Sequence, residues 1–208
     1  MSDLNFSPVR LFVLGLLEIQ PRHGYEIVAI AERWAVHRWA GISIGATYHS
    51  LGRLQKDGFV TAGKVEKAGN RPERQVWEIT ESGRATVRRY VEIALSSLNF
   101  EGRDVDMGLA FAGLLDPETR KKCLVQRMKP LNERLDQLRS FHEGYESCDV
   151  NLDPGLDEYR RLKREQPWIA ASVEHGLGRL EWEATWTNKL IGEVANWPSI
   201  TKRTEVRS

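Results

Sequence analysis

Residues 43–58 read SIGATYHSLGRLQKDG and predict a short amphipathic helix with a defined start and end. Ser43 can accept a hydrogen bond from a free backbone N–H group of the first turn, and Gly58 suits the position that ends a helix. The apolar residues at three- and four-residue spacing, which predict the buried face, are Ile44, Tyr48, Leu51 and Leu54. The residues predicted on the opposite face are Ala46, His49, Ser50, Arg53 and Lys56. Such a helix can be fixed to the protein on one side and stay open to a partner on the other.

Two β-rich runs and a further helix are predicted after this stretch. Residues 59–66 and 74–80 are rich in β-branched and aromatic residues, which predicts two strands. Residues 68–72, which read AGNRP, contain the turn-forming types Gly, Asn and Pro, so we expect the strands to form a hairpin. Thr80 and Ser82 can then cap a helix whose apolar residues continue to Leu98.

Two more helices are predicted before residue 43. Ser7 followed by Pro8 is a typical helix start, and this helix is expected to reach about Ile19. A second helix is expected from Tyr25 to about Val36. Three helices, a β-hairpin and a further helix, in that order, are typical of a winged helix-turn-helix. We therefore expect a mainly α fold with a small β-hairpin wing, joined to a C-terminal helical dimerisation domain.

In a winged helix-turn-helix, the third helix enters the major groove and the hairpin lies along the DNA backbone. Candidates for base edges are the small or polar side chains of its first two turns, Ala46, Thr47, His49 and Ser50. Candidates for phosphates are Ser43, Tyr48, Arg53 and Lys56 on the helix, and Lys64, Lys67, Arg71 and Arg74 on the hairpin. Any one of these cations could equally belong to an ordinary solvated surface, so the prediction depends on their joint placement around one helix.

The charge of the whole chain does not by itself indicate a nucleic-acid partner. Thirty Lys and Arg residues and 29 Asp and Glu residues leave a formal net charge of +1, so contacts with DNA must be local. Cys123 and Cys148 are too few and too far apart for a disulfide framework. The apolar run at residues 11–17 is shorter than a membrane span. We therefore expect a cytoplasmic protein.

Five motifs follow one another between residues 13 and 84. They are Val13-Leu14-Gly15-Leu16-Leu17, His23-Gly24-Tyr25-Glu26-Ile27, Thr47-Tyr48-His49-Ser50-Leu51-Gly52-Arg53-Leu54, Lys56-Asp57-Gly58 and Ile79-Thr80-Glu81-Ser82-Gly83-Arg84. Together they closely resemble the PadR family of bacterial transcriptional regulators, over about residues 8–95. The resemblance implies a homodimer that binds a pseudo-palindromic operator in double-stranded DNA. It also implies repression until a small effector, often aromatic or phenolic, weakens DNA binding.

The sequence departs from the family pattern at two positions of the third helix. His49 stands where a Pro is common, and Gly52 stands where a bulkier residue is usual. A glycine inside a helix costs up to about 1 kcal/mol of stability relative to alanine. These departures leave the operator sequence open.

The C-terminal half contains a heptad pattern and a second long helix. A brief helix is expected near residues 107–115, and the apolar residues of the following seam are Leu124, Met128, Leu131, Leu135, Leu138 and Tyr145, with His142 at the remaining position. Pro130 is expected to kink or restart that helix, residues 149–155 to form a loop, and residues 168–196 to form the last helix. We therefore predict a DNA-binding domain at residues 1–98 and a helical domain at residues 99–208 that dimerises and binds an effector.

The last helix carries four residues that could line an effector pocket. They are Trp168, His175, Trp182 and Trp186. Aromatic walls with a polar group suit a planar ligand. Ordinary packing at an interface would explain the same residues, and the two interpretations are compatible.

Enzyme and metal sites are not indicated by the sequence. The five histidines and two cysteines lack the short spacings of zinc sites, and no nucleophile or phosphate-loop motif is present. Gly176-Leu177-Gly178 is interpreted as a close helix–helix contact. We therefore expect no cofactor, no metal and no catalytic activity. The alternative to DNA binding is a winged-helix module for protein interaction, which the cations around the third helix argue against.

Overall fold

The computed structural model describes residues 6–66, 74–98, 103–146 and 167–200. In chain order, the helices and strands are α1 (Pro8–Ile19), β1 (Arg22–His23), α2 (Gly24–Arg33), α3 (Val36–Trp39), α4 (Ile44–Lys56), β2 (Val60–Glu66), β3 (Arg74–Ile79), α5 (Glu81–Ser96), α6 (Arg103–Ala110), η1 (Ala112–Leu114), α7 (Pro117–Glu146), α9 (Pro167–Glu193) and η2 (Val194–Asn196). Two compact units are formed. The winged-helix unit comprises Met1–Cys123 and Val194–Ser208, and the helical-hairpin unit comprises Leu124–Glu193.

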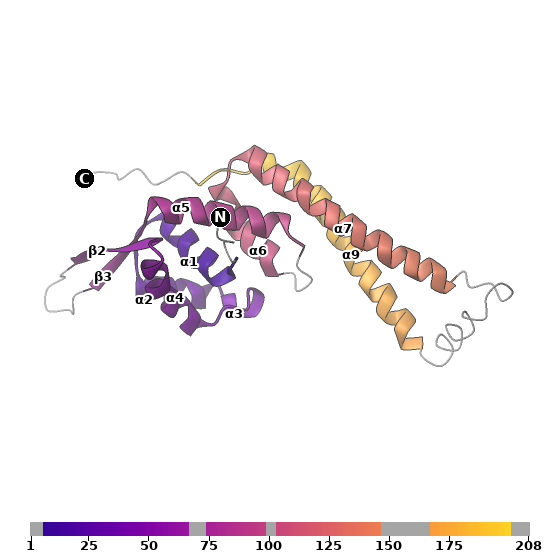
Figure 1. Ribbon diagram of the computed structural model, residues 1–208, viewed down its shortest axis with the longest axis horizontal. Coiled ribbons are helices and arrows are strands. Elements are labelled where there is room, and N and C mark those ends of the chain that lie inside the picture. Colours follow the sequence, from indigo (N-terminus) through magenta and orange to yellow (C-terminus); the bar gives the residue numbers. More distant parts are fainter. Residues whose placement is uncertain (1–5, 67–73, 99–102, 147–166, 201–208) are drawn as a thin grey trace. The chain divides into compact units, whose positions relative to one another are not determined.

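Helix α1 lies at the centre of the winged-helix unit, among α4, α5, α6 and β3 (Figure 1). Every residue from Leu11 to Leu17 is buried. The ring of Phe12 meets the rings of Trp34 and Phe111 edge-on, with centroids 6.0 and 6.3 Å apart. The predicted bounds of this helix are confirmed, but the Ser7 side chain makes no capping hydrogen bond.

The predicted hairpin is confirmed and gains a third strand. Strands β2 and β3 pair antiparallel, with Val60 opposite Ile79, and β1 pairs with the other edge of β3 through Arg22 and Trp77. The order in the sheet is β1-β3-β2. The sequence did not predict β1, because a two-residue strand has no periodicity and its partner lies far along the chain.

The helices around the hairpin largely follow the predictions. Helix α2 ends at Arg33 rather than near Val36, because Ala35 takes a left-handed conformation with φ of 50° and the short helix α3 follows. Helix α5 begins as predicted, since the Thr80 side chain accepts a hydrogen bond from the Gly83 N–H at 3.1 Å.

The winged-helix unit extends beyond residue 98, where we predicted a domain boundary. Helix α6 packs against α5 and α1, and Met107 and Phe111 are fully buried. Arg120, also fully buried, donates hydrogen bonds to the carbonyl of Trp197 at 3.0 Å and to the hydroxyl of Ser199 at 3.1 Å. The chain segments that precede and follow the helical-hairpin unit in sequence are thus both part of the winged-helix unit.

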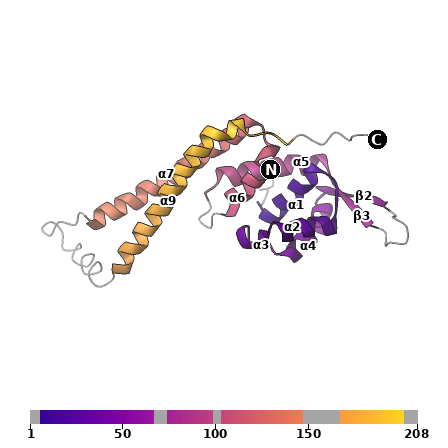
Figure 2. The same cartoon turned by 180° about the vertical axis from the view of Figure 1, so that it is seen from behind.

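Helices α7 and α9 form the antiparallel helical hairpin and lie side by side in both views (Figures 1 and 2). The predicted apolar seam is buried at Leu124, Leu131 and Leu135, whereas the Tyr145 side chain lies outside the described residues. Helix α7 continues through Pro130, so the prediction of a restart there was wrong. Proline removes a single backbone hydrogen bond, and the buried leucines on both sides of it hold the helix against α9.

The two glycines of the 176–178 motif differ in their surroundings. A Cβ at Gly176 would lie 3.2 Å from Cδ2 of Leu138 in α7, whereas a Cβ at Gly178 would meet nothing within 4 Å. The predicted close helix–helix contact is therefore confirmed for Gly176 alone. The predicted loop at residues 149–155 lies outside the described residues.

We expect Gly83→Ala to destabilise the winged-helix unit. An added Cβ would overlap the carbonyl oxygen of Phe59 and lie 2.7 Å from Cγ1 of Ile79, so the start of α5 would have to move away from the hairpin. Overpacking of this kind lowers the free energy of unfolding by about 1–3 kcal/mol, which urea denaturation can measure. The matched control is Gly178→Ala, which has room for the methyl group and should not destabilise the protein. Equal stability of Gly83→Ala and the parent protein would contradict this account.

Candidate nucleic-acid interface

Helix α4 is held firmly at both ends and along one face. The Ser43 side chain accepts a hydrogen bond from the Ala46 N–H at 3.1 Å, as predicted, and Gly58 follows the helix with a left-handed φ of 76°. Leu51 and Leu54 are buried against the rest of the winged-helix unit. The direction in which α4 presents its outer face is therefore fixed by the fold.

The buried face of α4 is shifted by one residue from the predicted face. Thr47 is fully buried and Ser50 nearly so, and their hydroxyls donate to the carbonyls of Ser43 at 3.3 Å and Thr47 at 2.8 Å. Tyr48, in contrast, is 61% exposed. The prediction that Ser50 points outward and Tyr48 inward was therefore wrong. Hydroxyls that bond within their own helix can occupy a buried face, and hydrophobicity alone does not reveal this. The Thr47 side chain is therefore closed to a partner, and Ser50 is only 5% exposed.

The outer face of α4 carries one continuous exposed stripe. We define the exposed stripe as Gly45, Tyr48, His49, Gly52, Arg53 and Lys56. Ser43 is exposed just before it, and Ala46 is half-buried at its margin. The stripe thus contains four of the eight α4 residues, counting Ser43, that we predicted to contact DNA. It combines an aromatic hydroxyl, an imidazole and two cations.

An aromatic pocket lies along one margin of the exposed stripe and has a volume of about 460 Å³. Its lining residues are His23, Gly24, Tyr25, Tyr48, Leu51, Gly52, Gln75 and Trp77. The rings of His23 and Tyr25 stack with centroids 5.4 Å apart, and Nδ1 of His23 lies 3.2 Å from the Gln75 carbonyl oxygen. The pairing of β1 with β3 creates this pocket. The predicted site residues therefore did not include His23, Tyr25, Gln75 and Trp77.

A smaller basic pocket lies along the other margin of the stripe and has a volume of about 250 Å³. Its lining residues are Ser7, Val9, Arg10, Ala46, His49, Ser50 and Arg53. Arg10 forms an ion pair with Asp57. Burial acts to lower the pKa of the Arg10 guanidinium, but hydrogen bonds to Asp57 and Tyr90 outweigh it and hold that pKa above its ordinary value. Arg10 is therefore charged and paired with Asp57, and Arg53 is the second cation of the pocket lining.

Four of the predicted DNA contacts belong to the β-hairpin. Lys64 and Arg74 belong to β2 and β3, but their side chains lie outside the described residues. Lys67 and Arg71, between the two strands in sequence, also lie outside the described residues. All four stay predictions.

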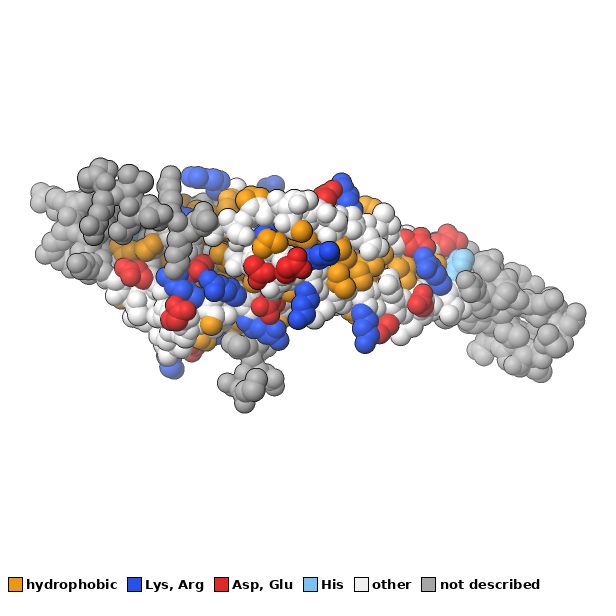
Figure 3. Space-filling model, turned by 90° about the horizontal axis from the view of Figure 1, so that it is seen from above, with side chains coloured by type: hydrophobic (Ala, Val, Ile, Leu, Met, Phe, Trp, Pro, Cys, Tyr) orange, Lys and Arg blue, Asp and Glu red, His pale blue; other side chains and the backbone are white. Residues whose placement is uncertain are grey.

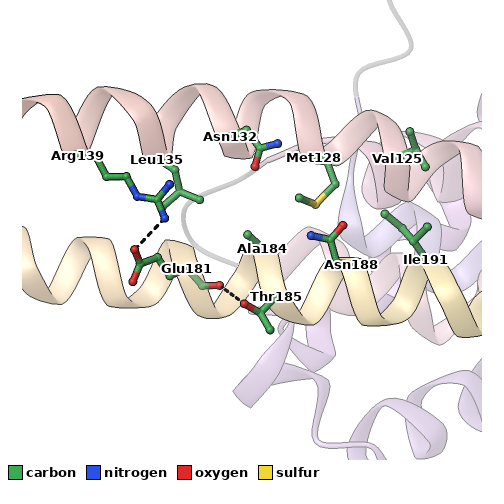
Figure 4. Close-up of a pocket in the computed structure, with 10 residues that line it drawn as sticks. All are labelled: Val125, Met128, Asn132, Leu135, Arg139, Glu181, Ala184, Thr185, Asn188 and Ile191. Carbon is green, nitrogen blue, oxygen red and sulfur yellow. Dashed lines mark hydrogen bonds and ion pairs between the residues drawn. The ribbon is translucent and has the colours of Figure 1, made fainter.

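The helical-hairpin unit contains a groove between α7 and α9 with a volume of about 760 Å³ (Figure 4). Asn132 and Asn188 extend into it from opposite helices, and Arg139 donates to Glu181 at 2.9 Å. The other lining residues are Val125, Met128, Leu135, Ala184, Thr185 and Ile191. The groove therefore combines apolar walls with two amide groups and one ion pair.

None of the four predicted effector residues lines this groove. Trp168 is 64% exposed and Trp182 61% exposed, and His175 is exposed as well. Trp182 and Trp186 stack on each other, with ring centroids 5.7 Å apart and planes 10° from parallel. The tryptophans thus form an aromatic surface on α9 rather than the wall of the described cavity.

Two classes of site are not found in the described part of the chain. No group of three or more His, Cys, Asp and Glu side chains there could hold a metal ion. No helix there is both long and apolar enough to cross a membrane.

One family of known proteins matches part of the winged-helix unit. A sequence model of the Transcriptional regulator PadR-like family matches residues 13–89. Among curated proteins, no sequence matches the chain.

Several solved structures are similar to the chain over most of its length. Bacillus subtilis PadR in complex with operator DNA is 16% identical, with 89% of this chain and 98% of that chain covered and a TM-score of 0.38. The protein smu.1604c from Streptococcus mutans UA159 is 22% identical, with 88% and 98% covered and a TM-score of 0.38. Bacillus subtilis PadR in complex with p-coumaric acid is 14% identical, with 90% and 99% covered and a TM-score of 0.34.

We expect Ser43→Ala to lower the free energy of unfolding by about 1 kcal/mol, because it removes the side-chain acceptor of the Ala46 N–H. Ser7→Ala provides a matched control at the start of α1, where the serine makes no capping bond and little change is expected. Thermal or urea unfolding of the two variants gives the comparison. A loss at Ser7 as large as that at Ser43 would show that capping is not what Ser43 contributes.

Proposed function

The chain carries, at residues 13–89, a domain of the Transcriptional regulator PadR-like family, and we propose that it is a DNA-binding repressor that acts as a homodimer and is released by a small effector. Members of this family are transcriptional regulators and not enzymes. The observation that carries the proposal is the exposed stripe of α4, which lies within the matched residues. We place such a repressor in the cytoplasm, where it meets DNA.

The chemistry of the stripe supports insertion of α4 into the major groove. His49 can donate to or accept from base edges, and the half-buried Ala46 beside it can pack against a thymine methyl group. Ser43, Tyr48, Arg53 and Lys56 would then hold phosphates, because they surround the same face of the helix. Lys64, Lys67, Arg71 and Arg74 on the hairpin are proposed to extend these contacts along the backbone.

Dimerisation is supported by the aromatic surface of α9. Two stacked tryptophans, one of them 61% exposed, are rarely left to solvent, and aromatic residues are enriched at protein interfaces. A second copy is the partner we propose for this surface, since a two-fold homodimer reads a pseudo-palindromic operator with two identical helices. This assigns Trp182 and Trp186 to the interface.

The effector site that we propose is the groove between α7 and α9. A volume of about 760 Å³ is in the range of small-molecule sites, and its apolar walls with two facing amides suit a planar ligand with polar substituents. A ligand there would bias how the two helices pack, and this packing can be coupled to DNA binding through the dimer. Aromatic and phenolic acids are the class to test first.

We expect the full-length protein to bind the DNA upstream of its own gene with an affinity that falls as salt rises, because phosphate contacts release counterions. Fluorescence anisotropy over a salt series measures this, and a panel of aromatic and phenolic acids tests release. His49→Ala should change the sequence preference of binding. Absence of specific binding at every salt concentration would favour a winged-helix module for protein interaction instead.

We expect Trp182→Ser to weaken the homodimer at least tenfold, because it removes a large aromatic anchor from the proposed interface. Sedimentation equilibrium over a concentration series measures the dimer dissociation constant. Lys189→Ala, another exposed position on α9, is the matched control and should leave the constant unchanged. A Trp182→Ser protein that dimerises like the parent would remove this surface from the interface.

A further inference from the structure

We propose that the two pockets beside α4 seat the backbones of the two DNA strands, the aromatic pocket holding one strand through neutral donors and ring packing and the basic pocket holding the other through charge. This inference rests on the proposed DNA binding. It adds His23, Tyr25, Gln75 and Trp77 to the interface on one side, and Ser7 and Arg10 on the other side.

The pockets lie along opposite margins of the same helix. Tyr48 and Gly52, four residues apart, belong to the aromatic pocket, and His49 and Arg53, also four residues apart, belong to the basic pocket. These two rows are neighbours on α4, but the pockets extend from them to different elements, β1 and β3 for the aromatic pocket and the start of α1 for the basic pocket. The major groove is about 12 Å wide, and a helix with its side chains is about 10–12 Å in diameter. A helix inserted there meets one strand's backbone along each margin.

The aromatic pocket has the chemistry of a sugar–phosphate seat. Its neutral donors are the Tyr48 hydroxyl, the Gln75 amide and the Trp77 indole N–H, and none of its described lining residues is Lys or Arg. Aromatic faces can pack against the carbon atoms of a deoxyribose, while the donors bond a phosphate oxygen. A ligand that is apolar on one side and an acceptor on the other fits this lining.

Two glycines line the aromatic pocket. A Cβ at Gly24 would come within 3.4–3.7 Å of Leu51, Tyr48 and Trp77, so any longer side chain would enter the pocket. Gly52 lines the pocket as well, and a Cβ there would meet nothing within 4 Å, so a longer side chain would have space to extend from this position. The departure of Gly52 from the family pattern thus coincides with an opening beside the recognition helix.

The basic pocket has the chemistry of a phosphate seat. Arg53 is exposed at its rim, and Arg10 forms its wall with one partner, Asp57, already in place. The Ser7 hydroxyl also lines this pocket and can donate a further hydrogen bond to a phosphate oxygen, while His49 at its margin stays available to base edges. Charge-assisted bonds from guanidinium groups to phosphate are stronger than those from neutral donors. The two seats should therefore differ in how they respond to salt.

The test compares two variants across the salt series. Arg53→Ala should lower affinity and reduce the slope of log K against log salt by about two, because it removes one ionic phosphate contact from each protomer of the homodimer. Tyr48→Phe should lower affinity about tenfold and leave the slope unchanged, because a neutral donor releases no counterion. Arg38→Ala, an exposed cation outside both pockets, is the charge control and should change neither value. Equal slopes for Arg53→Ala and the parent protein would overturn the division of roles.

A second measurement tests the assignment to strands. Single neutral methylphosphonates are scanned along each strand of the bound DNA, at symmetric positions in both half-sites. The position whose effect disappears in Arg53→Ala should lie on one strand, and the position whose effect disappears in Tyr48→Phe on the other. Coupling of both variants to the same strand, or of neither to any position, overturns the inference.

A pocket-filling variant separates this inference from the proposed function. Gly52→Leu should lower affinity more than tenfold, because it adds a bulky side chain at a position that lines the aromatic pocket. Circular dichroism and the melting temperature verify that the variant is folded. If the parent protein binds its DNA but folded Gly52→Leu and Tyr48→Phe bind equally well, the aromatic pocket is not a seat, although the protein is a DNA-binding regulator. If the parent protein itself does not bind, the proposed function fails and this inference fails with it.

Discussion

The winged-helix unit depends on the burial of α1 on nearly all its sides. Each large apolar side chain that is fully buried contributes about 1.5–3 kcal/mol, and α1 offers an unbroken run of buried residues from Leu11 to Leu17. Gly15 lets the Phe111 ring approach the helix backbone, since a Cβ there would lie 2.5 Å from the ring. Because α4 and α5 both pack on α1, its position determines the direction in which the exposed stripe faces.

A buried charge fixes the end of the same helix. The carboxylate of Glu18 is buried and is bound by Arg84, with Nη2 of Arg88 at 3.6 Å. An unpaired carboxylate in this position would cost several kcal/mol, so the pair orients α5 on α1. The basic residues at the start of α5 thus have a structural role, whereas those on the exposed stripe are available to a partner.

Most of the fold could be predicted from the sequence, because its signals are local. The bounds of α1, α4, α5 and the hairpin follow from capping residues, helical spacing and turn residues that act within a few positions. The short strand β1 and the grouping of α6 with the winged-helix unit could not be predicted. Both depend on contacts with segments far along the chain, namely β3 for β1 and α1 for α6.

The candidate site was less predictable than the fold. The cations of α4 were found because charged residues on an amphipathic helix face outward. Tyr48 was predicted on the buried face and Thr47 as a DNA contact, because hydrophobicity ranks a tyrosine above a threonine. In the structure Thr47 is the buried residue, since its hydroxyl can donate a hydrogen bond within its own helix. The aromatic pocket had no local signal at all, since its residues come from three separate segments, which are brought together by the pairing of β1 with β3 and the packing of α2 on α4.

A nearly neutral chain places a constraint on how a regulator can recognise DNA. On the face shown in Figure 3, acidic and basic side chains are interspersed among the described residues, which matches the net charge of +1. Non-specific binding is almost entirely electrostatic, so a net charge near zero adds little to it beyond what local cations supply. What matters for regulation is the ratio of specific to non-specific affinity. Neutral donors and ring packing act only when a backbone is seated at short range, so contacts of this kind raise specific affinity without raising the attraction to all other DNA.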